Sequence, residues 1–150
     1  MTEETATEKV EPKMSIFDIC ETDTTAEENG RWFKDLFEDG TGINVKLRRM
    51  TSTASMNARR RLDKQNRGKM NKKGEYDSET GMRVLVEQMA EGVIVDWENI
   101  VGRDGEAIPY TKENAIELMT KLPAFRDMIL VTAQDLDSFR IEDREDALKN

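Results

Sequence analysis

Residues 96–129 read DWENIVGRDGEAIPYTKENAIELMTKLPAFRDMI, and this stretch predicts the fold of the C-terminal half of the chain. Apolar pairs stand on either side of Asp104-Gly105, a pattern typical of a tight reversal. Thr111 then stands where it can cap a short helix. Pro123 suits the first turn of another helix, because its missing N–H would be unpaired there anyway. The stretch therefore predicts a reversal followed by two helices.

The acidic residues around this reversal raise the question of a calcium site, and their spacing argues against one. With Gly105 at the sixth position of an EF-hand loop, Ile100 takes the first position and Thr111 the twelfth, where carboxylates are required. Moving the register to Gly102 places Trp97 first, which is no better. We interpret the segment as a turn.

The segment before the reversal predicts the strongest helix. Asp77 or Ser78 can cap it, and Gly92 weakens its middle without forbidding continuation. Apolar residues recur along it at three- and four-residue intervals and form one wide face: Val86, Met89, Ala90, Val93, Ile94 and Trp97. We expect one helix that ends before Gly102.

Residues 31–50 predict a β-hairpin. Two runs rich in apolar and β-branched residues flank a loop that contains Asp39-Gly40 and Gly42, and such loops favour reversal. In the second run Ile43, Val45 and Leu47 alternate with polar residues, so one face should be buried.

A surface helix is expected next, to about Gln65, with Met56 and Leu62 as its main apolar contacts and Ala58 beside them. Residues 66–74 are basic and punctuated by glycine, which favours a mobile loop.

Together these elements predict a mainly α-helical protein of the α+β class. Its single helical domain should span residues 15–139, with an N-terminal hairpin and a basic loop at 66–75. Residues 1–14 should form a disordered acidic arm, and residues 140–150 a charged tail. The short apolar run at 16–20 fits either a strand or a docking anchor, and residues 24–30 fit a turn or one helical turn that closes at Gly30.

Composition narrows the possible chemistry. The chain has 150 residues, 37% of them apolar and 36% charged, and it contains no histidine. The commonest general base and the commonest zinc ligand are therefore missing. The single cysteine, Cys20, excludes a disulfide within the chain and a multi-cysteine metal site, and its acidic neighbours make it a poor nucleophile.

No catalytic motif is present: the chain has no Gly-x-Ser-x-Gly elbow, no P-loop and no Gly-x-Gly-x-x-Gly. We expect a protein that is not an enzyme and that uses no cofactor and no metal. Near Met1 no basic start precedes an apolar core, and no run of about 18 apolar residues occurs. We therefore expect neither a secretory signal nor a membrane span, and a cytosolic location.

The net charge of −8 conceals a sharp division along the chain. Residues 1–42 carry 12 acidic and 4 basic residues, and residues 75–150 carry 18 acidic and 8 basic residues. Residues 43–74 between them carry 1 acidic and 11 basic residues. This basic segment could contact nucleic-acid phosphates or dock on an acidic protein surface. The segment lacks aromatic residues for base stacking and the rest of the chain is acidic, so the acidic surface is favoured.

The motif at 97–123 also resembles a known family, the tail assembly chaperones of long-tailed, siphovirus-type bacteriophages. In that family a Trp-containing segment precedes an Asp-Gly turn, then an apolar-Pro-aromatic-Thr segment and a helix of the type x-E-N-A-x-x-L. The matching residues here are Trp97, Asp104, Gly105, Pro109, Tyr110, Thr111, Glu113, Asn114, Ala115 and Leu118, followed by Leu122 and Pro123. A looser likeness reaches back through residues 26–64, and residues 1–14 and 66–75 match no motif of the family.

The resemblance implies a non-enzymatic role in phage tail assembly. Proteins of that family coat the long, aggregation-prone tape measure protein until tail tube subunits polymerise around it, and they are absent from the finished virion. The implied partners are the tape measure protein and the tail tube protein of the same phage, in the cytoplasm of the infected bacterium, with a homo-oligomer as a further option.

A helical partner needs an exposed apolar groove on the protein that receives it. The residues expected to line such a groove are Leu118, Met119, Leu122, Phe125, Met128 and Ile129, and the alternative is that these six side chains form the core. Electrostatic docking is assigned to Arg59, Arg60, Arg61, Lys64, Arg67 and Lys69.

Two other functions stay open. One is a nucleic-acid-binding regulator that uses these six basic residues together with Lys72 and Lys73. The other is an acidic decoy of nucleic acid that blocks a host protein, suggested by 31 acidic against 23 basic residues.

Overall fold

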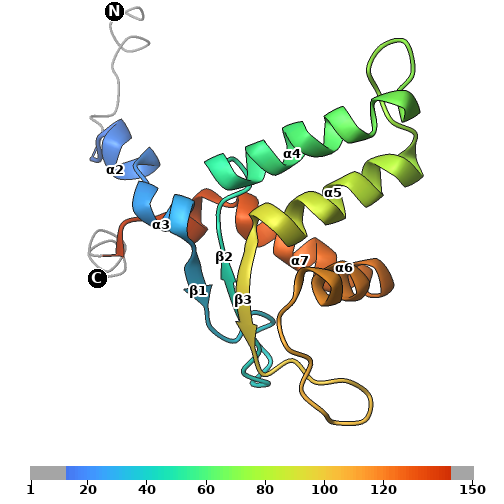
Figure 1. Cartoon of the computed structure of the whole chain (residues 1–150). Coiled ribbons are helices and arrows are strands. Elements are labelled where there is room, and N and C mark those ends of the chain that lie inside the picture. Colours follow the sequence, from blue (N-terminus) through green and yellow to red (C-terminus); the bar gives the residue numbers. More distant parts are fainter. Residues whose placement is uncertain (1–12, 143–150) are drawn as a thin grey trace, which may run out of the picture.

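The computed structural model describes residues 13–142, in which a small antiparallel sheet is combined with helices (Figure 1). Figure 1 shows α4 and α5 running side by side to a protruding loop, with α7 behind the sheet and α6 next to α7 below α5. This arrangement confirms the expected mainly α-helical, α+β class. In chain order the elements are α2 (Ile16–Cys20), α3 (Thr24–Asn29), β1 (Arg31–Phe33), β2 (Asn44–Leu47), α4 (Thr53–Gln65), η1 (Arg67–Lys69), α5 (Ser78–Gly92), β3 (Ile94–Glu98), α6 (Lys112–Lys121), α7 (Pro123–Gln134) and η2 (Leu136–Phe139).

The predicted hairpin is confirmed as β1 and β2, which pair antiparallel with Phe33 opposite Val45. Val45 and Leu47 are fully buried, as their alternation predicted. The loop between the strands is longer than expected, and the Asp35 carboxylate organises it by accepting hydrogen bonds from the backbone N–H groups of Gly40 and Gly42.

The long helix predicted through Trp97 is wrong in its last part. Helix α5 begins after its Asp77 cap as expected but ends at Gly92, and the next residues form β3, which pairs with β2. A Cβ on Gly92 would lie 2.5 Å from the Cα of Ser55, so α4 crosses α5 at this point. Strand β2 offers an open edge beside Ile94, whose β-branched side chain suits a strand. The unpaired edge and the crossing helix together override the helical pattern.

Helix α4 agrees with the prediction in extent but not in all of its contacts. Its cap is Ser52, and Ala58 and Leu62 are buried. Met56 was expected to be a main contact, but its side chain is 39% exposed. The small side chain of Ser55 is buried in its place, because α5 approaches too closely there for a larger residue.

Residues 66–75 were expected to form a loop, and they contain regular turns. Arg67–Lys69 form one 3₁₀ turn, and the side chain of Asn66 donates to the Leu62 carbonyl at 2.8 Å. The side-chain oxygen of Asn71 accepts from the N–H groups of Lys73 and Glu75, both at 2.9 Å. The backbone here is held by a defined set of local hydrogen bonds.

The predicted reversal and the two helices after it are confirmed. Gly105 has a φ of +80°, and Val101 and Ala107 pair across the turn. Thr111 caps α6 by accepting from the Asn114 N–H at 2.9 Å. Pro123 occupies the first turn of α7.

Near the N-terminus the structure decides between the alternatives for residues 16–20. They form the short helix α2, capped by a reciprocal pair of hydrogen bonds between Ser15 and Asp18, so the strand alternative is wrong. Residues 24–29 form α3, which closes at Gly30 as expected.

At the other end, Arg140 donates to the Ile19 carbonyl and belongs to the folded part, not to a free tail. Residues 1–12 of the predicted arm and 143–150 of the predicted tail lie outside the described residues.

Aromatic rings join the motif at 97–123 to the core. Trp97 packs edge-on against Tyr110, with ring centroids 5.2 Å apart, and against Phe125 at 6.2 Å. The Trp97 indole N–H donates to the Ile108 carbonyl at 2.7 Å, and the Tyr110 hydroxyl lies 3.0 Å from the carbonyl of Ile94. The residues of the motif therefore fasten the reversal to the sheet and to α7.

Candidate functional site

An apolar pocket of about 340 Å³ opens between the β1–β2 loop, the segment after β3 and the corner between α6 and α7. Its rim carries two apolar side chains that face solvent: Val101 is 56% exposed and Leu122 is 50% exposed. The lining residues are Phe37, Thr41, Ile43, Asn99, Ile100, Val101, Leu118, Leu122 and Phe125. None of these lining residues is charged.

Local sequence explains how the pocket forms. Leu122 lies between the end of α6 and Pro123, which begins α7, so the chain turns there and Leu122 remains at the corner instead of entering a helix face. On the other wall the Leu36 N–H donates to the Ile43 carbonyl at 2.8 Å, which closes the β1–β2 loop. Phe37 from this loop lies against Phe125, with ring centroids 6.4 Å apart. Two segments distant in the sequence thus build one pocket.

The structure divides the six residues predicted to bind a partner into three groups. Leu118, Leu122 and Phe125 line the apolar pocket. Met119 and Ile129 are fully buried in the core, so neither is presented to a partner in this structure. Met128 is half-buried and lines a different hollow.

Sequence reasoning missed the opposite wall of the pocket. Phe37, Ile43, Ile100 and Val101 lie outside the predicted set, although Ile43 was recognised as part of a buried face and Ile100-Val101 as an apolar pair beside the turn. The available signal was the presence of apolar residues in loops, since a loop that exposes such residues often carries a binding surface.

Two of the six predicted electrostatic residues are engaged within the chain. Arg59 pairs with Asp63 at 2.9 Å and lies over the Tyr76 ring, and Arg61 pairs with Glu91. The other predicted residues behave differently: the Arg60 guanidinium donates only to the Asn57 side chain, and Lys64, Arg67 and Lys69 are exposed without an ion pair among residues 13–142. Arg59 and Arg61 are therefore paired within the chain, whereas Lys64, Arg67 and Lys69 have no ion pair among residues 13–142.

Glu91 on α5 forms ion pairs with two cations from neighbouring helices. Its carboxylate accepts from Arg61 on α4 and from Lys112 on α6, and its side chain is largely buried. Burial raises the pKa of Glu91, but the hydrogen bonds from Lys112 and Arg61 outweigh it and lower that pKa below its ordinary value of 4.5. Glu91 therefore stays ionised and ties three helices together.

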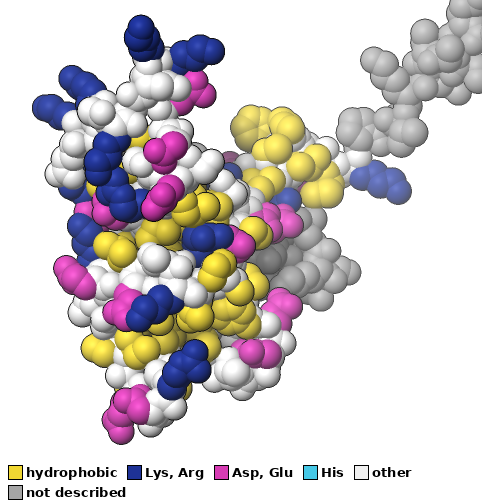
Figure 2. Space-filling view, turned by 90° about the vertical axis from the view of Figure 1, so that its right-hand side faces the viewer, with side chains coloured by type: hydrophobic (Ala, Val, Ile, Leu, Met, Phe, Trp, Pro, Cys, Tyr) yellow, Lys and Arg dark blue, Asp and Glu magenta, His cyan; other side chains and the backbone are white. Residues whose placement is uncertain are grey.

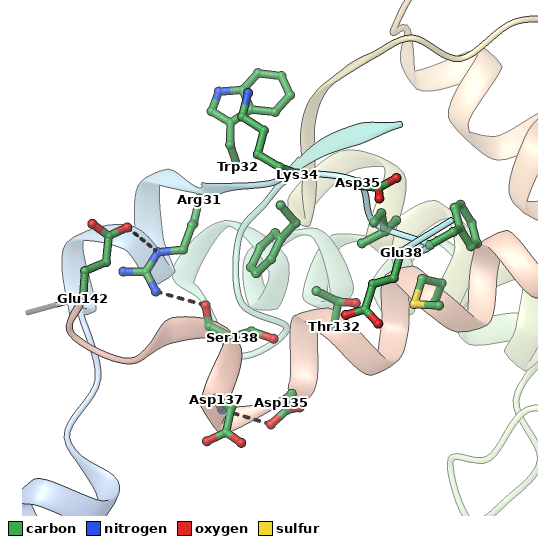
Figure 3. Close-up of a pocket in the computed structure, with 14 residues that line it drawn as sticks. Arg31, Trp32, Lys34, Asp35, Glu38, Thr132, Asp135, Asp137, Ser138 and Glu142 are labelled. Atoms are coloured by element: carbon green, nitrogen blue, oxygen red, sulfur yellow. Dashed lines mark hydrogen bonds and ion pairs between the residues drawn. The ribbon is translucent and has the colours of Figure 1, made fainter. Parts of the chain in front are cut away.

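A second hollow, of about 790 Å³, lies between β1, the loop after it, the C-terminal part of α7 and η2 (Figure 3). Five carboxylates and two cations line it, and Figure 3 shows Arg31 directed toward Ser138 and Glu142, with Trp32 and Lys34 pointing away from them. The carboxylates are Asp35, Glu38, Asp135, Asp137 and Glu142. This acidic hollow was not foreseen, because its residues come from two ends of the chain.

The Arg31 guanidinium is committed to the protein. It donates to the carbonyls of Ser138 and Arg140 at 3.0 and 2.8 Å and pairs with Asp23 at 3.3 Å. Lys34 lies 4.0 Å from Glu98 and 5.2 Å from the Trp32 ring centroid. Arg31 thus has partners outside the group of five carboxylates as well as Glu142 within it at 3.9 Å, whereas Lys34 pairs outside the group.

Across residues 13–142, no three His, Cys, Asp or Glu side chains are grouped so that they could hold a metal ion. The Asp104 carboxylate accepts from the Glu106 N–H at 2.9 Å, so it shapes the turn. Cys20 is an exposed free thiol. Among the helices described, none is both long and apolar enough to cross a membrane.

Comparison with known proteins places the chain in a family. Residues 47–150, which include most of the helical layer, the basic loop and six of the nine lining residues of the apolar pocket, match the model of the YdaY prophage protein family. No curated protein and no solved structure matches the chain. A match over this share of the sequence establishes phage ancestry, and the chain belongs to the YdaY family of prophage proteins.

Proposed function

We propose that this prophage protein is a tail assembly chaperone, which binds apolar helical segments of the tape measure protein and shields them until tail tube subunits assemble. The observation that carries the proposal is the apolar pocket with Leu122 and Val101 on its rim. Helices dock on other proteins by placing apolar side chains into such hollows. Phage ancestry and the resemblance of the motif at 97–123 to tail assembly chaperones support the same role.

The size of the pocket suits side chains of a helix better than a whole ligand. At about 340 Å³ it lies near the lower end of the range of small-molecule pockets, roughly 300–1,000 Å³. A few apolar side chains on one helix face would fill it, while the exposed rim residues contact the same helix. Because the contacts are apolar and carry few hydrogen-bonding groups, helices of different sequence can bind.

The proposal includes no chemical step. The role would be performed in the cytoplasm of the infected bacterium, without a cofactor or metal, and the protein would be released before the virion is complete. Recruitment of tail tube subunits would use another surface, since the apolar pocket is occupied by the tape measure segment at that stage.

The test is co-expression with the tape measure protein encoded by the same prophage. We expect the wild-type chain to keep the tape measure protein in the soluble fraction, and Leu122→Asp to lose this effect because a carboxylate would enter an apolar contact. Loss of one well-buried apolar side chain corresponds to roughly tenfold to hundredfold weaker binding. The matched control is Val131→Asp, which changes a residue on α7 that is 60% exposed and does not line the pocket.

Two results would decide against the proposal. A tape measure protein that is equally insoluble with and without the wild-type chain removes the chaperone function. Equal protection by the Leu122→Asp and wild-type proteins, both folded by circular dichroism, would place binding on another surface.

A further inference from the structure

The last residues of α4 and the loop that joins it to α5 form a basic tip, defined as residues 64–75. It contains five cations and a single acid, Glu75. All five cations are exposed, and none has an ion pair among residues 13–142: Lys64, Arg67, Lys69, Lys72 and Lys73. Figure 2 shows Lys and Arg side chains gathered at the upper end of the molecule. In a protein of net charge −8, this is a concentrated positive surface.

At its end the basic tip forms a turn that is held by backbone and side-chain hydrogen bonds. The Gly74 N–H donates to the Asn71 carbonyl at 3.0 Å, so Lys72 and Lys73 occupy the two central positions of a four-residue turn. The Asn71 N–H donates to the Glu75 carbonyl at 2.8 Å, and the Asn71 side chain accepts two further N–H groups. The two lysines are therefore presented at the apex by a backbone that needs little ordering before it binds.

The basic tip also stands away from the acidic body. Helix α4 has 13 residues, which corresponds to a length of about 20 Å. The Debye length at physiological salt is about 8 Å, so acids at the base of the helix pair neutralise the tip poorly. Glu75, Asp77 and Glu79 lie in or beside the tip and reduce its charge, but its five cations outnumber them, so a net positive potential is left for an external partner.

The acidic hollow supplies the complementary surface on the same chain. Figure 1 places β1, which forms part of the acidic hollow, on the other side of the molecule from the α4–α5 loop. The side chain of Asp137 is 70% exposed and that of Glu142 is 76% exposed, so both carboxylates face solvent, although each has an ion pair within the chain, Asp137 with Arg140 at 2.7 Å and Glu142 with Arg31 at 3.9 Å. One copy therefore cannot place its basic tip into its own acidic hollow, but a second copy can.

We propose that the protein self-associates head to tail, with the basic tip of one copy docked in the acidic hollow of the next. Lys72 and Lys73 would approach Glu38 and Asp137, and the concave shape of the hollow would receive the turn. Because the two surfaces differ, the contact is heterologous and can repeat along a row of copies. The inference does not depend on the proposed function, since it concerns the chain alone.

Sedimentation velocity of the purified chain tests the inference, with two charge-reversal variants. The tip variant is Lys72→Glu with Lys73→Glu, and the hollow variant is Glu38→Lys with Asp137→Lys. At low ionic strength we expect wild-type association that increases with protein concentration and at least a tenfold weaker association for each variant. Association should also disappear at about 1 M salt, where the Debye length is about 3 Å.

A mixture of the two variants gives the sharpest result. The tip variant keeps a wild-type hollow and the hollow variant keeps a wild-type tip, so the mixture should associate more strongly than either variant alone. Matched controls change the same net charge at exposed sites outside both surfaces: Lys13→Glu with Arg103→Glu, and Glu106→Lys with Asp127→Lys. Both control proteins should associate like the wild type.

Three outcomes would overturn the inference. The wild-type chain could be monomeric at every salt and protein concentration. It could associate equally after either charge reversal. It could remain monomeric while its basic tip retards a DNA duplex at low salt and the tip variant does not, which would make the tip a surface for nucleic-acid phosphates.

Discussion

At the scale of single residues, Gly92 has the most crowded surroundings of the described glycines. A Cβ at this position would lie 2.8 Å from the Ala54 carbonyl oxygen and 2.5 Å from the Ser55 Cα, and both are backbone atoms of α4. Backbone cannot rotate away as a long side chain can. Gly92 thus sets how closely α4 and α5 approach, and with it the position of the helix pair over the core.

Replacing this glycine should therefore destabilise the protein. We expect Gly92→Ala to lower the free energy of unfolding by about 1–3 kcal/mol, the usual cost of overpacking, although alanine favours helix. Gly81 lies on the same helix, where an added Cβ would be 3.7 Å from the Tyr76 Cβ, an ordinary van der Waals contact. Gly81→Ala should raise stability by about 0.5–1 kcal/mol. Urea unfolding of both variants measures the difference, and equal effects would contradict the role of the crossing.

At the scale of elements, the three helices α4, α5 and α6 are held together by a surface ion-pair cluster and a buried amide as well as by apolar contacts. Glu91 bonds to Arg61 and Lys112, and the Gln88 amide donates to the Ser55 hydroxyl at 3.0 Å. Buried polar groups with partners fix one arrangement of helices, since a sliding helix would leave them unpaired. No buried side-chain N or O atom among the described residues lacks a hydrogen-bond partner.

The charge on Glu91 leads to a prediction about pH. Because its pKa is lower in the folded protein than its ordinary value of 4.5, ionised Glu91 stabilises the fold above that pH. This contribution is lost as pH falls through the folded pKa. The difference in unfolding free energy between wild type and Glu91→Gln should be constant near neutrality and shrink below about pH 4.5.

A double substitution provides the control for this pH effect. In the background Arg61→Gln with Lys112→Gln, the partners that lower the pKa of Glu91 are removed. The effect of Glu91→Gln should then lose its decline with falling pH. Denaturant unfolding at several pH values measures all four proteins, and a decline that persists in the double background would assign it to other groups.

At the scale of the whole molecule, the two ends of the described chain are fastened to each other. Arg31 donates to the carbonyls of Ser138 and Arg140, and the Asp23 N–H donates to the Phe139 carbonyl at 2.7 Å. Thr22 and Arg140 form an isolated β-bridge. These contacts between residues 22–31 and 138–140 are called the clasp. The clasp forms one wall of the acidic hollow, so the proposed self-association depends on it.

Breaking the clasp should loosen the ends without unfolding the centre. The Arg31 side chain is only 13% exposed, and Arg31→Met would leave two carbonyls and Asp23 without this donor, at a cost of about 1–3 kcal/mol. Hydrogen exchange should accelerate at the Asp23 amide and stay unchanged at the Arg48 amide, which donates to the Val93 carbonyl.

Lys34→Met is the matched control for this substitution, since its side chain is 67% exposed and its ion pair with Glu98 spans 4.0 Å. It should leave the Asp23 amide protected. Equal acceleration at Asp23 and Arg48 in Arg31→Met would mean global destabilisation instead of a loosened clasp.

The two proposed surfaces are compatible within one molecule. The apolar pocket lies at the α6–α7 corner, whereas the basic tip and the acidic hollow involve the α4–α5 loop and the clasp. A row of copies joined tip to hollow would present the apolar pocket at regular intervals. Such a row would suit a long helical partner, and the two experiments separate the claims, since one uses the tape measure protein and the other the chain alone.

The sequence by itself determined the elements whose ends are set by local hydrogen bonds. Asp77 and Thr111 cap their helices, Pro123 begins α7, and Asp104-Gly105 turns the chain, as their positions predicted. Caps and turns are satisfied by neighbours within a few residues, so their signals can be read along the chain. The hairpin of β1 and β2 was predictable for the same reason.

Only the tertiary structure decided what residues 93–98 become and which apolar side chains reach the surface. A helical spacing and a run of β-branched residues coincide there, and the open edge of β2 together with the α4 crossing at Gly92 selects the strand. Met119 and Leu122 look alike in sequence, yet one is fully buried and the other half-exposed at a corner. The physical reason is that burial depends on contacts between segments distant in the chain, which no local pattern records.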